Sequence, residues 1–510
     1  MQWAGAPLLA ARRSNETSGS VRATMTNMGS QVFLNYIGGE WCESQGGGTF
    51  ENRNPADTRD LVGRFQASTA DDAHAAVQAA SQAFPAWRKL SVAARAKILQ
   101  RAADYLEANA DTFARELTRE EGKLVGLARE EFLRSAQTLR FYAVEAQSYG
   151  GETFPCDDPQ MSVYTLREPL GVVTVISPWN FPVSIPARKI APALICGNTV
   201  VFKPSSDAPL SGLRLVEAFS KAGIPPGVLN LITGRASEVA PTILGAPAIR
   251  AVSFTGSTTA GEQIHRAVSF NTRTQMELGG KNPLIVLDDS NIARAVDLTV
   301  KGGFSLTGQA CTGTSRVLVT PAARGPFVLA LLDKVRSLRV GNGLEEGVEI
   351  GPLATADQLR TVMEYIETGR REATLAAGGE RLEGGGWEHG YFVTPTVFVD
   401  VRPEARIARE EIFGPVISVI DVENYEQAIA VANDSEYGLA AAIVTDDPAL
   451  MHRFANDIEA GTVKINRTTT GNLINAPFGG LKRSSTSTFR ESGRVGLEFY
   501  LQTKTVYRGY

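Results

Sequence analysis

Four short apolar runs, separated by segments of helical periodicity, constrain the fold of this chain more than any other feature. The runs are 172–176, 199–202, 228–232 and 251–254, and the helical segments between them are 187–195, 210–222 and 237–245. Continuous apolar strands that alternate with helices predict a parallel sheet covered on both faces. Ligands bind such sheets beyond the carboxyl ends of the strands. We therefore expect a site in the loops that follow these runs.

The remaining segments predict an α/β protein of more than one domain, because 510 residues exceed the size of an ordinary domain. A second strand–helix series begins at 283–287 and runs to about residue 480. Upstream of the first sheet, helices are expected at 71–84, 92–121 and 125–148, after a strand–turn–strand at 32–41. The alternating stretches 161–168 and 499–507 predict an exposed ribbon, whose edge invites pairing with another subunit.

Composition argues against several classes of protein. The net charge of −4 gives no basic footprint for nucleic acid. The sequence has no apolar stretch of the roughly 20 residues that a membrane span needs. The four cysteines form no CxxC pair and the four histidines are scattered, so we expect no metal site, and free thiols in a reducing, cytoplasmic compartment.

Residues 1–30 differ from the rest of the chain and are expected to be a disordered tail. They carry Arg12, Arg13 and Arg22 with a single acid, Glu16, which also fits a transit peptide weakly. A start codon placed too early is the third interpretation of this segment.

The thiol of Cys311 is the first candidate for chemistry. It lies within a loop of small residues, 307–316. A cysteine with the ordinary pKa of about 8.5 is mostly protonated at neutral pH, so a nucleophilic role requires activation. The alternative is that Cys311 is a buried small hydrophobe, which is common for a free cysteine.

Two polar residues in other loops are candidates to assist the thiol. Glu277 precedes a Gly-Gly turn and fits a general base, although a solvated glutamate beside a turn is the simpler interpretation. Asn180 follows the strand at 172–176 and fits an oxyanion donor, although asparagine is also frequent in turns. In addition, 254–261 leaves a strand and opens a helix, which suits a pyrophosphate.

Taken together, the motifs resemble those of the aldehyde dehydrogenase superfamily over about residues 31–508. The family's motifs are Trp-Asn-Phe-Pro, Lys-Pro-Ser, Phe-Thr-Gly-Ser, Glu-Leu-Gly-Gly-Lys, Gly-Gln-x-Cys, Glu-Ile-Phe-Gly-Pro and Pro-Phe-Gly-Gly. Here they stand in the same order at 179–182, 203–205, 254–257, 277–281, 308–311, 411–415 and 477–480.

This resemblance implies an α/β fold with a Rossmann-like cofactor domain, an α/β catalytic domain and a small β-ribbon oligomerisation element. The implied dinucleotide-binding domain comprises 31–146 and 169–278, and the catalytic domain 279–487. The ribbon comprises 147–168 and 488–510. The implied assembly is a homodimer or homotetramer.

The resemblance also implies the roles of the site residues. Cys311 attacks the aldehyde, Asn180 holds the oxyanion, Glu277 activates the water that hydrolyses the thioester, and Lys203 completes the catalytic group. The expected cofactor is NADP or NAD, with Lys203 and Glu411 at the riboses, Phe413 at the nicotinamide end and Trp179 near the adenosine side. The full set of expected cofactor residues is Ile176, Ser177, Pro178, Trp179, Lys203, Ser205, Ser206, Gly234, Phe254, Thr255, Gly256, Ser257, Glu277, Leu278, Gly279, Glu411 and Phe413.

One departure from the family bears on the dinucleotide. Many NAD-specific members carry Glu three residues after the motif lysine, and this chain has Ser206 there. A carboxylate at that position would repel the 2′-phosphate of NADP at short range, whereas a serine does not. The sequence therefore predicts that NADP is accepted.

Arg188, eight residues past Asn180, predicts a small aldehyde with an acidic tail, because arginine binds carboxylates in a bidentate fork. An arginine in a surface ion pair is the alternative. Succinate semialdehyde dehydrogenases resemble the chain at Arg188, but Ser305 replaces their second arginine. The late segments 466–471, 482–485 and 489–493 resemble 2,5-dioxovalerate (α-ketoglutaric semialdehyde) dehydrogenases. The expected substrate contacts are Arg188, Arg467, Thr469, Thr470 and Phe478.

Two other functions remain open from the sequence. One is a non-enzymatic binding protein on the same scaffold, and the other is a cysteine acyltransferase that binds no nucleotide. Glu277 argues against a CoA-acylating enzyme, because in such an enzyme a thiol rather than water takes the acyl group.

Overall fold

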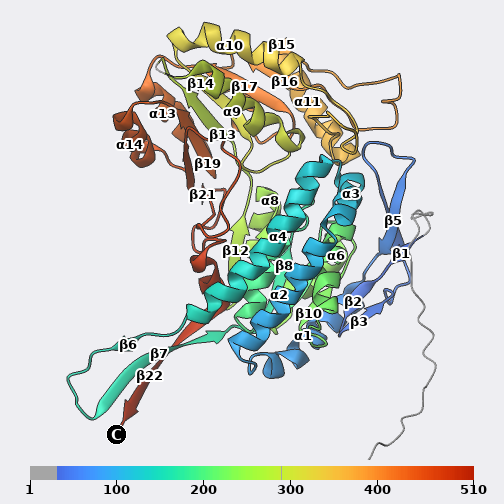
Figure 1. Ribbon diagram of the computed structural model, residues 1–510, viewed down its shortest axis with the longest axis vertical. Coiled ribbons are helices and arrows are strands. Elements are labelled where there is room, and N and C mark those ends of the chain that lie inside the picture. The colour runs from blue at the N-terminus through green and yellow to red at the C-terminus, as the bar shows by residue number, and fades with distance from the viewer. Residues whose placement is uncertain (1–30, 289) are drawn as a thin grey trace, which may run out of the picture.

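The computed structural model describes residues 31–288 and 290–510, and its two largest sheets have seven strands each (Figure 1). The first sheet runs, in spatial order, β12 (Arg273–Glu277), β11 (Ile249–Thr255), β8 (Val172–Ile176), β9 (Thr199–Lys203), β10 (Leu229–Leu231), β2 (Asn35–Ile37) and β3 (Glu40–Cys42). The first five strands are parallel, whereas β2 and β3 extend the sheet antiparallel. The predicted parallel sheet is confirmed. The tail expected at 1–30 lies outside the described residues.

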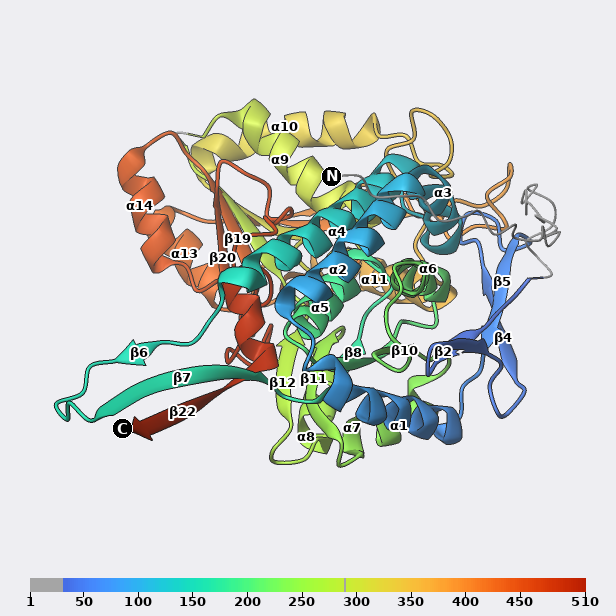
Figure 2. The same cartoon turned by 60° about the horizontal axis from the view of Figure 1, so that its bottom comes forward.

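Helices cover both faces of this sheet (Figure 2). They are α1 (Ala70–Trp87), α2 (Val92–Ala108), α3 (Ala110–Glu121), α4 (Val125–Glu145), α5 (Ser184–Ile195), α6 (Pro209–Lys221), α7 (Ala236–Gly245) and α8 (Thr258–Ala267). On β8, Val173 and Val175 pack into the core formed with α2 to α6, whereas Val172 packs with α1 and α7. Successive residues of a strand point to opposite faces, so a strand covered on both sides is apolar throughout.

The helical stretch predicted at 92–121 is two helices, α2 and α3, because the backbone of Asn109 leaves helical geometry (φ −109°, ψ 7°). Its side-chain amide donates to the carbonyl of Tyr105 at 2.8 Å, which satisfies one of the open carbonyls at the end of α2. The segment after α3 turns back through Gly122, in a left-handed conformation (φ 93°), into α4.

The second sheet carries the later part of the chain. Its strands, in spatial order, are β15 (Thr374–Ala377), β16 (Thr396–Val399), β17 (Val416–Asp421), β14 (Thr314–Val319), β13 (Asn282–Val286), β19 (Ala440–Val444) and β20 (Thr462–Ile465). Its helices are α9 (Ile292–Phe304), α10 (Pro321–Arg336), α11 (Ala356–Glu372), α12 (Arg406–Arg409), α13 (Tyr425–Asn433) and α14 (Pro448–Asp457). The chain passes from the first sheet to the second between β12 and β13, where the domain boundary is predicted.

A long ribbon projects from the body of the molecule (Figure 1). Its strand β7 (Met161–Pro169) pairs antiparallel with β22 (Leu501–Gly509), and the short β6 (Thr153–Phe154) joins the other edge of β7. The start of the segment 488–510, which is expected to belong to the ribbon, packs on the body of the molecule. Residues Arg494–Tyr500 form a 3-10 helix, and Leu497, Phe499 and Tyr500 belong to the first core.

Smaller strands complete the fold. β1 (Val32–Phe33), β5 (Leu61–Gln66) and β4 (Thr49–Arg53) form a three-stranded sheet, and β18 (Tyr437–Gly438) pairs with β21 (Leu481–Lys482). Within 31–288 and 290–510, no helix has the length and apolar character needed to cross a membrane.

Candidate active site

Two cavities meet at Cys311. The first has a volume of about 460 Å³ and is lined by α4, the start of α5, the loop at 305–312 and the segment 470–478. The second, of about 210 Å³, is lined by the ends of β8 and β11, the loop after β12 and the segment 411–413. Cys311 lies in the wall of both. A side chain in this position reaches ligands bound in either cavity.

The loop that carries Cys311 is held in an unusual backbone conformation. Leu306, Thr307 and Gly308 all have positive φ values, of 53°, 56° and 71°. A Cβ at Gly308 would lie 2.1 Å from the carbonyl oxygen of Gly414, so only glycine fits this close approach. The Thr307 hydroxyl anchors the loop by donating to the carbonyl of Gly351 at 3.0 Å. The loop that presents the thiol is therefore held by specific backbone contacts.

The environment of the Cys311 thiol favours its protonated form. Burial and the charge of Glu411 together raise the pKa of Cys311 to about 12, although the charge of Arg188 acts in the opposite direction. The backbone carbonyl of Cys311 accepts a hydrogen bond from the Asn282 side chain at 2.8 Å. Attack on a carbonyl thus requires a group that removes the thiol proton or stabilises the thiolate.

Asn180 lies beside Cys311 in the wall of the second cavity. Its side-chain Nδ2 donates to the carbonyl of Gln309 at 2.9 Å, and the residue is buried. An amide NH₂ has two N–H groups, so this bond orients the group and leaves the second N–H for another acceptor. The arrangement suits a donor to an oxygen that develops negative charge next to the thiol.

Glu277 ends β12 and is buried, with no hydrogen-bond partner for either carboxylate oxygen within the described part of the chain. Burial raises the pKa of the Glu277 carboxyl well above its usual value, and the charge of Glu491 adds to this effect. The ion pair of Lys189 and Glu491, at 2.8 Å, lies close enough for its charges to act on Glu277. Glu277 lines neither cavity, but its charge contributes to the raised pKa of Cys311.

Of the expected cofactor residues, nine line the second cavity. They are Pro178, Trp179, Thr255, Gly256, Ser257, Leu278, Gly279, Glu411 and Phe413. The Trp179 ring packs edge-on against Phe413, with centroids 5.4 Å apart, so Trp179 lies with the residue expected at the nicotinamide end. Gln358 completes the wall and carries no motif that would reveal it in the sequence. Its amide donates to the carbonyls of Ile412 and Phe413 and so fixes this segment.

The other expected cofactor residues do not line this cavity. They are Ile176, Ser177, Lys203, Ser205, Ser206, Gly234, Phe254 and Glu277. Lys203 is buried at the end of β9, its Nζ donates to the Pro204 carbonyl at 3.0 Å, and burial lowers its pKa to about 8. The Ser206 hydroxyl donates to the carbonyl of Gly234 at 2.8 Å. A carboxylate that the sequence analysis missed, Asp207, raises the pKa of Lys203 by its charge.

The polar groups around the second cavity fit a dinucleotide. The hydroxyls of Ser177 and Thr255 are buried at the ends of β8 and β11 with no hydrogen-bond partner among the described residues. Ser257 caps the N-terminus of α8, where backbone N–H groups favour a pyrophosphate. Glu411 accepts a hydrogen bond from the Gly280 N–H at 3.0 Å through one carboxylate oxygen. Its other oxygen would accept from a ribose hydroxyl.

Of the expected substrate contacts, Arg188, Thr470 and Phe478 line the first cavity. Arg467 and Thr469 do not. The Thr469 hydroxyl is buried and bonded to that of Thr314 at 2.8 Å, which explains why it faces no cavity. Arg467 is exposed on the surface.

Arg188 is already engaged within the protein. Its guanidinium donates to the Ser184 carbonyl at 3.3 Å, lies 3.5 Å from a carboxylate oxygen of Glu491 and sits over the Phe478 ring. Its orientation in the cavity is therefore fixed by these contacts. A charge held in this way acts on the cavity but is partly neutralised by Glu491.

Sequence reasoning missed a second arginine in the wall of this cavity, Arg134 of α4. Its guanidinium forms no hydrogen bond or ion pair with any described residue, whereas its neighbour on the same helix, Arg140, contacts Asp104 and Glu107. Burial and the nearby charge of Arg188 lower the pKa of Arg134. No sequence motif marks Arg134, because an arginine on a helix is ordinarily a solvated surface residue.

Comparison with known proteins agrees with this geometry. Residues 41–506 match the profile of the aldehyde dehydrogenase family. The chain is 45% identical over 478 residues to an alpha-ketoglutarate semialdehyde dehydrogenase of Haloferax volcanii, covering 93% of the chain and 99% of that protein. It is 43% identical over 478 residues to an alpha-ketoglutaric semialdehyde dehydrogenase of Bacillus subtilis, covering 93% and 98%. It is also 43% identical to a 2,5-dioxopentanoate dehydrogenase of Saccharolobus solfataricus, covering 90% and 95%.

Solved structures give the same result. Betaine aldehyde dehydrogenase of Staphylococcus aureus in complex with NAD⁺ superposes with a TM-score of 0.91 at 36% identity, covering 93% of this chain and 95% of that one. Both the family profile and the relatives extend over nearly the whole described chain. The aldehyde dehydrogenase fold expected from the motifs is confirmed, and the chain belongs to the aldehyde dehydrogenase family.

Proposed function

We propose that this chain oxidises an aldehyde with an acidic tail to the carboxylic acid, using NADP or NAD. The first substrate candidate is 2,5-dioxovalerate (α-ketoglutaric semialdehyde), and succinate semialdehyde is the second. The observation that carries the proposal is the position of Cys311 in the wall shared by two cavities, one suited to an aldehyde and one to a dinucleotide.

In the first half of the reaction, the Cys311 thiol gives its proton to water, and the sulfur adds to the carbonyl carbon and forms a thiohemiacetal. The Asn180 amide and the Cys311 backbone N–H stabilise the resulting oxyanion. NADP or NAD, held by the residues that line the second cavity, would supply the two-electron acceptor. Oxidation of the thiohemiacetal leaves an acyl thioester on Cys311.

In the second half, Glu277 removes a proton from water, which attacks the thioester carbonyl. The C–S bond breaks, the acid leaves, and the sulfur takes the proton from Glu277, which regenerates both the thiol and the base. Glu277 is suited to this role because its carboxylate forms no hydrogen bond with the described residues and is close enough to influence Cys311 electrostatically.

Two features support an acidic substrate. Arg134 and Arg188 both line the first cavity, and an anion there would relieve the repulsion between them. The three curated relatives described above are named for α-ketoglutarate semialdehyde or for 2,5-dioxopentanoate, another name of the same compound.

The dinucleotide choice rests on the loop after β9. Ser206 offers a hydroxyl where many NAD-specific members carry glutamate, which favours acceptance of NADP, with Lys203 close to the ribose. We propose that both dinucleotides are used. Steady-state kinetics with saturating aldehyde test this proposal. A preference for NAD beyond about a hundredfold, or about 2.8 kcal/mol, would contradict it.

The decisive experiment is a substrate panel of 2,5-dioxovalerate, succinate semialdehyde, betaine aldehyde and propanal, each with NAD and NADP, followed by dinucleotide absorbance. We expect the highest kcat/KM with 2,5-dioxovalerate and no turnover by Cys311→Ala. Faster turnover of betaine aldehyde or propanal than of both acidic aldehydes would overturn the substrate assignment. Unchanged turnover by Cys311→Ala would overturn the mechanism.

We further propose that the protein assembles as a homodimer or homotetramer through the ribbon, and that it works in the cytoplasm. The outer edge of β22 has no strand partner within the described residues. The four cysteines are all unpaired thiols, as expected in a reducing compartment.

A further inference from the structure

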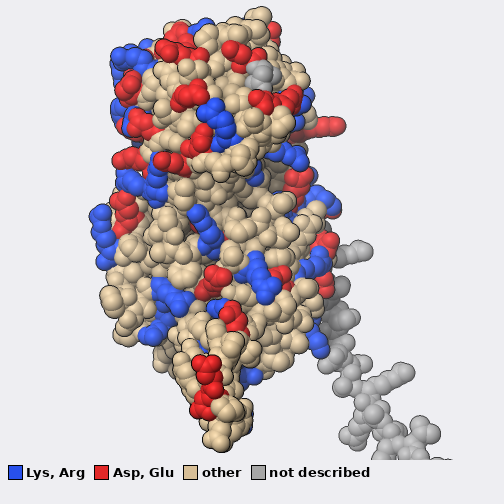
Figure 3. Space-filling view, turned by 90° about the vertical axis from the view of Figure 1, so that its left-hand side faces the viewer, with Lys and Arg blue, Asp and Glu red and all other residues tan. Residues whose placement is uncertain are grey.

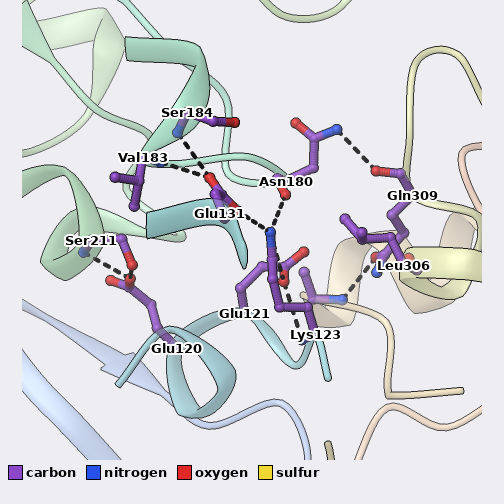
Figure 4. Close-up of polar contacts among 11 residues, drawn as sticks. Glu120, Glu121, Lys123, Glu131, Asn180, Val183, Ser184, Ser211, Leu306 and Gln309 are labelled. Carbon is purple, nitrogen blue, oxygen red and sulfur yellow. Dashed lines mark hydrogen bonds and ion pairs between the residues drawn. The ribbon is translucent and has the colours of Figure 1, made fainter. Parts of the chain in front are cut away.

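A buried lysine holds the backbone of the loop that carries Asn180. Lys123 lies between α3 and α4, and its side chain is 1% exposed. Its Nζ donates to the backbone carbonyl of Asn180 at 2.7 Å and contacts a carboxylate oxygen of Glu131 at 2.5 Å (Figure 4). The ring centroid of Phe181, the next residue along the loop, lies 4.7 Å from the same nitrogen. Lys123 is thus fixed to two consecutive residues of the loop.

Glu131, on α4, holds the other end of the loop. Its second carboxylate oxygen accepts hydrogen bonds from the backbone N–H groups of Val183 at 2.9 Å and Ser184 at 3.0 Å (Figure 4). These groups lie at the start of α5, where a helix leaves its N–H groups without internal partners. The two side chains therefore tie the segment from Asn180 to Ser184 to the rigid helix α4.

Stability alone does not explain this arrangement. Taking two charges out of water costs free energy that their attraction often fails to return, so buried ion pairs are frequently neutral for folding. Geometry offers a better reason. An oxyanion donor works only when it is held within about 0.5 Å of its place. The Asn180 side-chain amide donates one hydrogen bond, to the Gln309 carbonyl. This hydrogen bond fixes the direction of the amide only if the backbone of Asn180 is fixed as well.

We propose that Lys123 and Glu131 are positioning residues of the oxyanion site, which fix the Asn180 backbone so that the free N–H of its amide faces the carbonyl attacked by Cys311. This inference rests on the function proposed above. The inference gives Lys123 and Glu131, which belong to no family motif, a role in the chemical step. Both act through Asn180 and do not touch the reacting atoms of the substrate.

A neighbouring glutamate provides a matched control. Glu120, on α3, is also buried and also caps a helix, since it accepts from the N–H groups of Leu210 and Ser211 at the start of α6. Figure 4 shows its contact with Ser211. The described structure shows no contact from Glu120 to Asn180. Loss of either carboxylate should affect folding, but only loss of Glu131 should affect the chemistry.

The test compares Lys123→Met, Glu131→Gln and Glu120→Gln in acylation of Cys311 by an activated ester without dinucleotide. This reaction forms an oxyanion. Alkylation of Cys311 by iodoacetamide forms none and serves as the reference. We expect Lys123→Met to slow acylation about tenfold or more, because complete loss of an oxyanion donor lowers the rate about a hundredfold or more. The rate of alkylation should change less than about twofold. Glu120→Gln should leave both rates unchanged while lowering the melting temperature.

A double-mutant cycle distinguishes positioning from general damage. In an Asn180→Ala background, Lys123→Met should slow acylation less than about twofold, because the group that it positions is gone. An equal loss in both backgrounds, or equal slowing of alkylation and acylation, would overturn the proposal. Glu131→Gln keeps the shape of the cap and replaces Lys123→Met in the experiment if Lys123→Met does not fold. Acylation of Glu131→Gln at the parent rate would then refute the inference.

The ester assay also separates this inference from the proposed substrate. It needs neither an acidic aldehyde nor a dinucleotide, so the role of Lys123 is tested even if the parent oxidises no aldehyde of the panel. If the parent oxidises aldehydes but Lys123→Met is acylated by the ester at the parent rate, the positioning role is contradicted and the proposed function is not.

Discussion

Glu277 combines two properties that oppose each other at the scale of a single residue. Its place near Cys311 suits a general base, but its buried carboxyl has a pKa raised by desolvation and by the charge of Glu491. A carboxyl whose pKa lies above its ordinary value is protonated over a wider pH range, and only its deprotonated form accepts a proton from water. The base form therefore accumulates as pH rises.

The first prediction follows from the raised pKa of Glu277. When thioester hydrolysis limits turnover, kcat should rise with pH from the acidic side, because Glu277 loses its proton. Glu277→Gln should retain a single-turnover burst of reduced dinucleotide and lose about a hundredfold or more in steady-state rate. Stopped-flow absorbance at several pH values separates the burst from the steady state. A burst lost together with turnover would move Glu277 to the first half of the reaction.

The second prediction concerns the two arginines of the substrate cavity. Arg134 has no hydrogen-bond or ion-pair partner among the described residues, whereas Arg188 is engaged by Glu491. Arg134→Leu should raise KM for 2,5-dioxovalerate about tenfold or more, the effect of losing one hydrogen bond to a charged group, and leave KM for propanal unchanged. Arg188→Leu should also raise KM more for the acidic aldehyde, but it should disturb propanal turnover as well because it releases Glu491.

Arg140→Leu is the control for this experiment, because Arg140 lies on the same helix and its guanidinium is bound to Asp104 and Glu107. It should change neither KM. If Arg134→Leu changed KM equally for the acidic and the neutral aldehyde, a contact between Arg134 and the substrate carboxylate would be ruled out.

At the scale of elements, the strands that are buried on both faces could be predicted from the sequence. β8 and β9 were expected within one residue of their observed bounds, because apolar β-branched runs have few other solutions. The break at Asn109 between α2 and α3 could not, because helical periodicity continues across it. Likewise, the motifs revealed Cys311, whereas the places of Lys123, just before α4, and of Arg134, on α4, depend on how this part of the chain packs against distant segments.

The third prediction concerns the ribbon. Phe154, Leu166 and Tyr507 are exposed apolar side chains on its strands, and the face of the ribbon seen in Figure 3 is mostly uncharged apart from one acidic patch. Exposed edges and apolar patches of this kind favour pairing with another copy. Tyr507→Asp combined with Leu166→Asp should reduce the assembly to a smaller species in size-exclusion chromatography with light scattering. Phe270→Asp, at an exposed position outside the ribbon, should not. A monomeric parent would refute this assembly.

At the scale of the whole molecule, the site depends on both large sheets. Asn180 and Glu277 follow β8 and end β12 in the first sheet, whereas Cys311 precedes β14 in the second. Contacts such as the hydrogen bond from the Asn180 amide to the Gln309 carbonyl join the two parts. The reacting groups therefore keep their relative positions only while the parts remain docked, and conditions that weaken folding should weaken activity.

Buried carboxyls make this folding dependent on pH. Burial raises the pKa of Glu120 to about 7, of Glu121 to about 8 and of Glu411 to about 7, all above the ordinary value of 4.5. In this range the folded chain binds more protons than the unfolded chain, so the free energy of unfolding falls as pH rises. The stability contributed by the protonated forms is complete below about pH 4.5 and is lost as pH rises through 7 to 8.

The last prediction uses Glu121, which has one carboxylate oxygen without a hydrogen-bond partner among the described residues. Its other oxygen accepts from the Lys123 backbone N–H at 3.1 Å. Glu121→Gln should raise the melting temperature above that of the parent on the alkaline side, because the amide needs no deprotonation penalty, and the difference should shrink toward acidic pH. Differential scanning fluorimetry across the range measures it. Glu346→Gln, at an exposed position, should follow the parent curve. A constant offset between Glu121→Gln and the parent at every pH would show that the carboxyl does not titrate between the folded and unfolded states, and would contradict the raised pKa.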